Sequence, residues 1–561
     1  MARRSVEPEG ASVTGRPVWL DRTPEPIFAV LHAPPSSAAR RVAALMLPTF
    51  GWDNDCSYRA RRAWATRFAE AGITTARIDF PGTENSAGPT LGPNRVGSWI
   101  DATVSAAQWL REYSRCDRLV SVGTGLGGML AYEAIAAGAP IDDMVLWSVR
   151  ASGRTYVREL RAFSAIASGG TDQAVNEDGD EVTGLAGYAV SAEMLASMNA
   201  LQLTDTPLPN APSRRVLLLG RDANGVDRKL ERHLREAGAA VTAAETDDYH
   251  LLTEPPEFQR VPRQTIALAT EWVLGEPSAP HASHVSYTLP TPIAASAVNL
   301  THDGHEIREQ VCEIETPAGR LIGVLSVPSG GRQAPYCLVL TNAGALRHTG
   351  PSRMLVEIAR AAAAAGIPAV RVDLPGLGDS EGTARKTFER NDDDDAESLA
   401  LLSRIYDYVQ GLGIADRFVP AGLCSAAYFA LLIVPADARS VGAVALNPPT
   451  LRWGERERKV ALRGSAPYAN AETAELRSLA VRRVWDRVEQ LRYELEDSAR
   501  SRLARSDFLW RTARRAEITA TIEVLNRLGA TGAPLFLHLG DAETLLRMFA
   551  QPKVATALDR W

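Results

Sequence analysis

The chain has 561 residues, 45% of them hydrophobic and 23% charged, with a formal net charge of -6. This length exceeds what one ordinary hydrophobic core supports, so we expect two domains of similar size in a globular protein. The negative charge excludes a general attraction to nucleic acid or anionic membranes, and no run of residues approaches the roughly 20 apolar positions of a membrane span. The polar N-terminus and the five scattered cysteines predict a cytoplasmic location, without a metal site or a cofactor.

In the first half, apolar strands alternate with helical stretches. A strand pattern at residues 42–47 leads through a helical stretch to residues 71–86, which read AGITTARIDFPGTENS, and a helix is expected at 96–111. The apolar run 119–122 then precedes Gly-Thr-Gly-Leu-Gly, which has the strand, tight turn and helix context of a nucleophile elbow, Gly-x-Nu-x-Gly. Its central residue is Gly125, which carries no nucleophile.

A linker follows the first half. Before the linker, an insertion of about residues 153–213 has an acidic tip, and a helix is expected at 265–274. The next stretch is rich in Pro, Ser and His and has no sustained periodicity. We therefore predict domains at 1–275 and 305–561, joined by a linker at 276–304.

The second half repeats the pattern of the first. A predicted hairpin within 305–327 and a strand at 337–340 lead to residues 365–380, AGIPAVRVDLPGLGDS, which align with 71–86 without a gap. The second elbow reads Gly-Leu-Cys-Ser-Ala, with Cys424 at its centre. A later insertion, about residues 451–532, mixes Arg and Glu with aromatic residues; this favours amphipathic lid helices over a nucleic-acid surface. The alternation indicates a duplicated unit with a mostly parallel sheet and helices on both faces.

With RIDFPGTENS, RVDLPGLGDS and the two elbows, each half resembles an α/β-hydrolase. The resemblance covers nearly the whole chain except the linker and the insertions. The segments 152–160 and 187–193 are also similar to hydrolases associated with bacterial exopolysaccharide gene clusters. The resemblance implies two tandem α/β-hydrolase-like domains, each with a helical lid insertion, and chemistry at acyl groups.

A hydrolase of this fold uses a nucleophile, a carboxylate and a His, in that order along the chain. In the first half Asp222 and His250 stand at the positions of the carboxylate and the base, but Gly125 replaces the nucleophile. Two interpretations stay open. The pair either hydrogen-bonds only to itself or to a ligand, or it activates water or a substrate hydroxyl without covalent catalysis.

In the second half, Cys424 is followed by two candidate carboxylates, Asp541 and Glu543, between which the sequence does not choose. At the spacing of the first half, the base would fall beyond Trp561, and the last strand is expected to be missing. His348 is the substitute base to consider; the alternative is a surface histidine at a helix start. At the N-terminus of a helix the dipole favours a thiolate, which tolerates a missing base better than a serine does. The alternative for Cys424 is a small buried residue that fills a tight turn.

The oxyanion hole of this fold takes one backbone N–H from the residue after the nucleophile and one from the loop that follows the 337–340 strand. We therefore assign it to Ser425 and to the loop residues Asn342 and Ala343.

Two functions remain open. The first is an acyltransferase or an ester or thioester hydrolase that acts through an acyl-Cys424 intermediate on a small-molecule acyl or glycan-linked substrate. The second is a catalytically inactive tandem scaffold or ligand-binding protein. A third arrangement, in which His250 serves Cys424, requires the strand ends of both halves to face each other. Whether the protein forms a homo-oligomer is also open.

Overall fold

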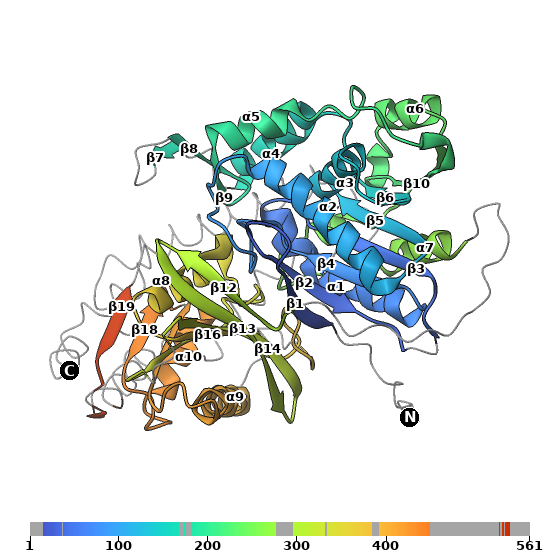
Figure 1. Ribbon diagram of the computed structural model, residues 1–561. Coiled ribbons are helices and arrows are strands. Elements are labelled where there is room, and N and C mark those ends of the chain that lie inside the picture. The colour runs from blue at the N-terminus through green and yellow to red at the C-terminus, as the bar shows by residue number, and fades with distance from the viewer. Residues whose placement is uncertain are drawn as a thin grey trace, which may run out of the picture. The chain divides into compact units, whose positions relative to one another are not determined.

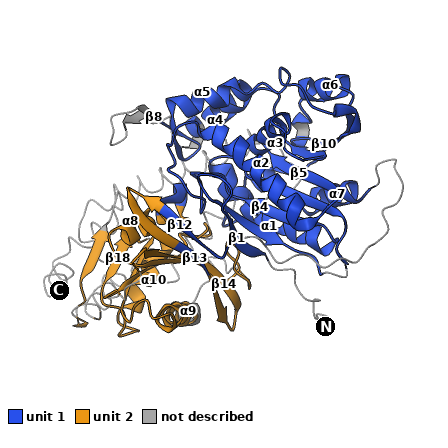
Figure 2. Cartoon of the chain, in the orientation of Figure 1, with its two compact units in different colours: residues 1–300, 309–311, 351–354 blue, residues 301–308, 312–350, 355–561 orange. Residues whose placement is uncertain are grey.

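The computed structural model describes residues 15–35, 38–167, 173–175, 181–275, 295–330, 334–383 and 392–448, together with residues 527, 530–531 and 533–538. The chain divides into two compact units (Figure 2). Unit 1 contains residues 1–300, 309–311 and 351–354, and unit 2 contains residues 301–308, 312–350 and 355–561. None of the helices in the described part of the chain is long and apolar enough to cross a membrane.

Unit 1 is built on an eight-stranded sheet with the order β1-β2-β4-β3-β5-β6-β10-β11 (Figure 1). β2 is antiparallel to β1 and β4, and all other neighbouring strands are parallel. The central strands are apolar and buried because helices cover both faces of the sheet. The strands are β1 (Arg16–Leu20), β2 (Ile27–His32), β3 (Val42–Leu47), β4 (Thr74–Ile78), β5 (Arg118–Thr124), β6 (Asp143–Trp147), β10 (Arg215–Leu219) and β11 (Ala240–Ala244).

Two hydrophobic cores flank this sheet. α2 (Arg95–Ser114), α3 (Leu126–Ala136) and α6 (Arg228–Glu236) pack against one face, where their buried residues join one core. α1 (Trp52–Glu70) and α7 (Arg263–Leu274) pack against the other face. Both cores contain large aromatic side chains, which bury extensive apolar area; they include Trp99, Trp109, Trp64, Phe68 and Trp147.

The first predicted insertion lies between β6 and β10 and is not wholly helical. It contains the helices α4 (Gly153–Ala167) and α5 (Ala192–Ala200). Between these helices lies an antiparallel three-stranded sheet made of β7 (Gln173–Val175), β8 (Glu181–Leu185) and β9 (Tyr188–Ser191). The predicted acidic tip, residues 176–180, is outside the described residues.

The second eight-stranded sheet has the order β12-β13-β14-β16-β15-β17-β18-β19, and its strands from β14 onward belong wholly to unit 2. β14 is antiparallel to β16, and the strands from β16 to β19 are parallel. The strands are β12 (Ala297–His302), β13 (His305–Thr316), β14 (Gly319–Pro328), β15 (Cys337–Leu340), β16 (Ala369–Val372), β17 (Phe418–Leu423), β18 (Ala443–Leu446) and β19 (Leu535–His538). The helices are α8 (Met354–Ala364), α9 (Asp392–Gly411) and α10 (Ser425–Ile433).

Both sheets are mostly parallel, and each carries its elbow strand, β5 or β17, next to β3 or β15. The predicted fold class, α/β with two mostly parallel sheets, is therefore confirmed. The predicted hairpin is β13–β14. The prediction of a linker at 276–304 is wrong for residues 297–302, which form β12 of the same sheet. Most of the second insertion, the candidates Asp541 and Glu543, and the region where a counterpart of β11 would follow lie outside the described residues.

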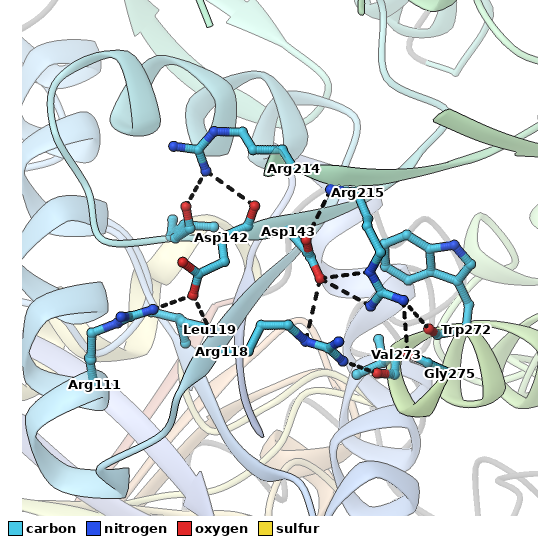
Figure 3. A network of polar contacts seen from close by, with 11 residues as sticks. Arg111, Arg118, Leu119, Asp142, Asp143, Arg214, Arg215, Trp272, Val273 and Gly275 are labelled. Atoms are coloured by element: carbon cyan, nitrogen blue, oxygen red, sulfur yellow. Dashed lines mark hydrogen bonds and ion pairs between the residues drawn. The ribbon is translucent and has the colours of Figure 1, made fainter. Parts of the chain in front are cut away.

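The amino ends of the strands in unit 1 are joined by an ionic network (Figure 3). The buried carboxylate of Asp143, at the start of β6, accepts hydrogen bonds from the Arg215 backbone N–H and guanidinium at 3.0 to 3.1 Å. The Arg118 guanidinium lies 3.4 Å from the same carboxylate. Since the elbow is at the carboxyl end of β5, this network lies at the opposite edge of the sheet and fixes the strands rather than a site.

Candidate active sites

The two elbows have the same backbone conformation. Gly125 has φ 53° and ψ -120°, and Cys424 has φ 58° and ψ -119°. The N–H of Gly125 donates to the Trp147 carbonyl at 3.1 Å, and that of Cys424 donates to the Leu446 carbonyl at 3.0 Å. Each central residue is thus held by the carbonyl at the end of the neighbouring strand and forms the cap of a helix, α3 or α10. The strand-turn-helix geometry of a nucleophile elbow is present twice.

Small residues beside the apex are required by close packing. A Cβ on Gly123 would lie 2.4 Å from the Gly128 backbone nitrogen, and a Cβ on Gly422 would lie 2.3 Å from the Ala426 Cβ. The sharp turn brings the first helical turn back against the end of the strand, so that a side chain at either glycine would collide with it. Ala426 stands in place of the last Gly of the motif. Its methyl group fits in the second elbow because Gly422 has no side chain.

Cys424 differs from the other four cysteines in its exposure. Cys424 is exposed to solvent, whereas the cysteines at positions 56, 116, 312 and 337 are buried. Burial raises the pKa of all four buried thiols, that of Cys312 to about 12. The alternative expectation for Cys424, a small buried residue that fills a turn, is therefore wrong.

The predicted oxyanion loop lies against the second elbow. The Gly344 backbone N–H donates to Ser425 Oγ at 2.8 Å, and the same hydroxyl donates to the Asn342 carbonyl at 3.4 Å. Among the described residues, the backbone N–H groups of Ala343 and Ser425 have no hydrogen-bond acceptor. Both N–H groups belong to the segments that the sequence indicates, and their role as oxyanion donors stays a prediction.

Asn342 has a structural role in this loop. Its Nδ2 donates to Asp373 Oδ1 at 2.7 Å and to the Leu346 carbonyl at 2.8 Å. Its Oδ1 accepts the Leu374 backbone N–H at 2.7 Å. The side chain of Asn342 therefore holds the loop in place, and the choice between the Asn342 and Ala343 backbone N–H groups as the oxyanion donor stays a prediction.

His348 is buried and paired with a carboxylate. It is 2% exposed, its Nδ1 lies 2.7 Å from Asp373 Oδ2, and its backbone N–H donates to Asp373 Oδ1 at 2.6 Å. Burial raises the pKa of Asp373, but the neighbouring His348 and the Asn342 amide outweigh it, so that the pKa lies below its ordinary value of 3.8. The expectation of a surface histidine is wrong. The pair ties the loop after β15 to the end of β16.

Asp373 is the residue of this site that sequence reasoning missed. It matches Asp79 in the gap-free repeat, and this repetition in both halves was the available signal. The structure joins His348 to it, while a role of His348 as base for Cys424 stays a prediction.

In unit 1, Asp222 and His250 are brought together as the sequence predicts. The distance between His250 Nδ1 and Asp222 Oδ1 is 3.7 Å, longer than a hydrogen bond. The same Asp222 oxygen accepts the Tyr249 backbone N–H at 3.0 Å. Both side chains are partly exposed, by 34% and 17%. The carboxylate and the imidazole are therefore neighbours that are not hydrogen-bonded to each other, and a catalytic role of this pair stays a prediction.

The position above Gly125 is filled by a side chain that the sequence did not reveal. A Cβ on Gly125 would lie 3.0 Å from Thr49 Oγ1 and 3.3 Å from Tyr156 Cε2. Tyr156 comes from α4, and its buried hydroxyl forms no hydrogen bond of ordinary geometry within the described residues. Burial and Asp53 raise its pKa well above the usual range, although the Thr49 side chain and the Leu126 backbone N–H act in the opposite direction.

Leu126 is the counterpart of Ser425, since each follows the apex of its elbow. The Tyr156 hydroxyl therefore lies beside the N–H that would serve as an oxyanion donor in unit 1. A substrate carbonyl would have to displace this phenol. The side chain and the missing nucleophile both oppose covalent chemistry at Gly125.

Ion pairs fasten α4, and with it Tyr156, over the first elbow. Glu159 of α4 binds Arg221 at 3.0 Å and Arg150 at 2.8 Å. The Arg221 guanidinium also lies 5.0 Å above the ring of Tyr249, whose pKa is raised by burial to about 12. Because Arg150 follows β6 and Arg221 follows β10, α4 is held to the carboxyl ends of both strands. No group of three or more metal-ligating side chains occurs in the part of the chain that the structure describes.

No protein-family model matches the chain, and no curated protein is similar to it in sequence. Solved structures that resemble it include XC6422 from Xanthomonas campestris, an a/b serine hydrolase without lid, with 15% identity, a TM-score of 0.31 and coverage of 48% of this chain and 96% of that one. Est1E from Butyrivibrio proteoclasticus, solved with ferulic acid, has 14% identity, a TM-score of 0.31 and coverage of 46% and 95%. Proline iminopeptidase from Mycobacterium smegmatis has 13% identity, a TM-score of 0.31 and coverage of 46% and 98%.

Proposed function

We propose that unit 2 is an acyl hydrolase or acyltransferase that forms an acyl-Cys424 thioester. The observation that carries the proposal is an exposed thiol at the apex of an elbow with φ 58°. A residue with a Cβ in such a region costs about 1–3 kcal/mol, and strain of this kind gathers at active sites. Glycine, which stands at this position in unit 1, avoids the cost.

The geometry supports a two-step reaction. The Cys424 thiolate adds to the carbonyl carbon of an ester or thioester, and the carbonyl electron pair moves to the oxygen. The N–H groups of Ala343 and Ser425 are the donors for that oxyanion. When the carbonyl reforms, the alcohol or thiol leaves with its electron pair, and water or another acceptor later attacks the thioester. His348, Asp541 and Glu543 remain the candidates that handle the proton.

We further propose that unit 1 forms no covalent intermediate and has a supporting or ligand-binding role. Gly125 offers no nucleophile, and Tyr156 stands in the space above it. Of the two functions that the sequence leaves open, the inactive scaffold thus applies to unit 1, and the acyl chemistry applies to unit 2.

The test is covalent trapping on the full chain. The protein is incubated with p-nitrophenyl acetate, quenched in acid and mapped by mass spectrometry of its peptides. We expect one acetyl group, on Cys424, that hydroxylamine removes. Iodoacetamide should label Cys424 in the native protein and the other four cysteines only after denaturation, since these are buried.

The matched control is Cys424→Ala, which keeps the elbow but removes the thiol. It should lose the acetyl group and the release of p-nitrophenolate together. Unchanged release by the variant, or acetyl groups spread over surface lysines in both proteins, would contradict the proposal and favour a wholly inactive tandem scaffold.

A further inference from the structure

The side chain of Ser425 joins the second elbow to the oxyanion loop. Ser425 begins α10, directly after Cys424. Its Oγ accepts the Gly344 backbone N–H at 2.8 Å and donates to the Asn342 carbonyl at 3.4 Å. These two groups belong to the residues on either side of Ala343. One hydroxyl thus holds both peptides that flank the loop's oxyanion donor.

This contact matters because the two oxyanion donors come from separate segments. β15 and β17 are paired up to Leu340 and Ala421, and the loop that carries Ala343 continues past the last pair. Sheet pairing alone therefore does not set the distance between the Ala343 and Ser425 N–H groups. An oxyanion hole works only when both donors lie about 2.7–3.1 Å from the developing charge.

Unit 1 provides an internal comparison. The residue after its elbow apex is Leu126, which is buried and has no hydroxyl. The corresponding loop therefore has no such side-chain contact from α3. The hydroxyl occurs in the unit with the thiol and is missing from the unit whose apex is Gly125.

We propose that Ser425 is a positioning residue, whose Oγ sets the spacing between the Ala343 and Ser425 N–H groups in the transition state of acyl transfer. This inference rests on the proposed function of Cys424. Asn342, held from the other side by Asp373, completes the support of the loop.

The test compares two reactions of the same thiol. Acylation by p-nitrophenyl acetate passes through a tetrahedral oxyanion, which expels p-nitrophenolate as the carbonyl reforms. Alkylation by iodoacetamide forms the S–C bond as iodide leaves and involves no oxyanion. A defect in the oxyanion hole therefore slows only the first reaction, whereas a distorted elbow changes both.

We expect Ser425→Ala to slow the acylation of Cys424 at least about tenfold, toward the ~100-fold or greater loss that follows removal of a donor. Alkylation should stay within about twofold of wild type, and Ser425→Thr, which keeps the hydroxyl, should restore most of the acylation rate. Equal acylation of wild type and S425A, or an equal fall of both reactions, would overturn the positioning role alone. A wild-type chain that is alkylated but never acylated would overturn the proposed function as well.

Discussion

Backbone strain at Cys424 makes a quantitative prediction about stability. At φ 58° and ψ -119°, a residue with a Cβ costs about 1–3 kcal/mol relative to glycine. Glycine in turn loses about 0.5–1 kcal/mol more than alanine through its freedom in the unfolded chain. Cys424→Gly should therefore be more stable than Cys424→Ala by about 1 kcal/mol, within a range of about 0–2.5 kcal/mol. Both variants lack the exposed thiol, so their difference isolates the backbone.

The reciprocal change in unit 1 is the control. Gly125→Ala places a Cβ at φ 53°, 3.0 Å from Thr49 Oγ1 and 3.3 Å from Tyr156 Cε2. It should destabilise by the same strain and by an added cost for crowding. Thermal and urea unfolding of the full chain measure both effects; for a unit of this size, 1 kcal/mol corresponds to about 2–4 °C in Tm.

If Cys424→Gly is no more stable than Cys424→Ala while Gly125→Ala behaves as expected, the elbow of unit 2 is not strained. The argument that a strained cysteine marks an active site would then fail. If Cys424→Gly also keeps the acyl chemistry, the thiol itself is excluded as the nucleophile.

Three further predictions concern buried polar groups. Tyr156→Phe removes a hydroxyl that has no hydrogen-bond partner of ordinary geometry. The free energy of unfolding in urea should therefore stay equal or rise by up to about 1 kcal/mol; a fall of more than about 1 kcal/mol would show that the hydroxyl forms a strong hydrogen bond. Asp143→Asn leaves two guanidinium groups without their buried carboxylate and should cost about 3 kcal/mol, whereas Asp117→Asn, at a surface pair, should cost under about 1 kcal/mol. The pKa of Asp373 is lower in the folded state than its ordinary value of 3.8. The ionised Asp373 therefore stabilises the folded protein above pH 3.8, and this contribution to the free energy of unfolding is lost as the pH falls through the lower pKa of the folded state. Urea midpoints between pH 6 and pH 3 should thus fall less steeply for Asp373→Asn, and parallel curves would refute this.

The sequence predicts those features that depend on local geometry. An elbow needs a strand, small residues at fixed offsets and a helix start, all within a few positions, so that both apices, Gly125 and Cys424, could be found. The gap-free repeat of 16 residues likewise reveals the β4 and β16 regions. The pair of Asp222 and His250 was found because each follows a strand that the hydrophobic pattern shows.

Long-range contacts explain what the sequence could not reveal. Tyr156 is above Gly125 only because α4 folds back over the sheet, and Glu159 holds it there through two arginines. His348 lacks any local sign of burial, since its partner Asp373 is 25 residues away. β12 was assigned to the linker because its alternating pattern is short and follows a Pro-rich stretch, although pairing with β13 makes it a strand.

The differences between the two elbows all point in one direction. In unit 1 the apex is Gly125, which relieves the strain, and Tyr156 fills the space above it. The next residue is Leu126, which has no hydroxyl to offer to the loop after β3. In unit 2 the apex keeps a strained Cys424, and Ser425 binds both sides of Ala343. Each of these features of unit 1 favours stability over chemistry. The strained backbone of unit 2 costs stability, and such a cost is retained where a reaction uses the strained residue. A protein that used neither site would have no reason to keep the strain and the hydroxyl in the same unit, so the joint presence of Cys424 and Ser425 is a stronger argument for activity than the thiol alone.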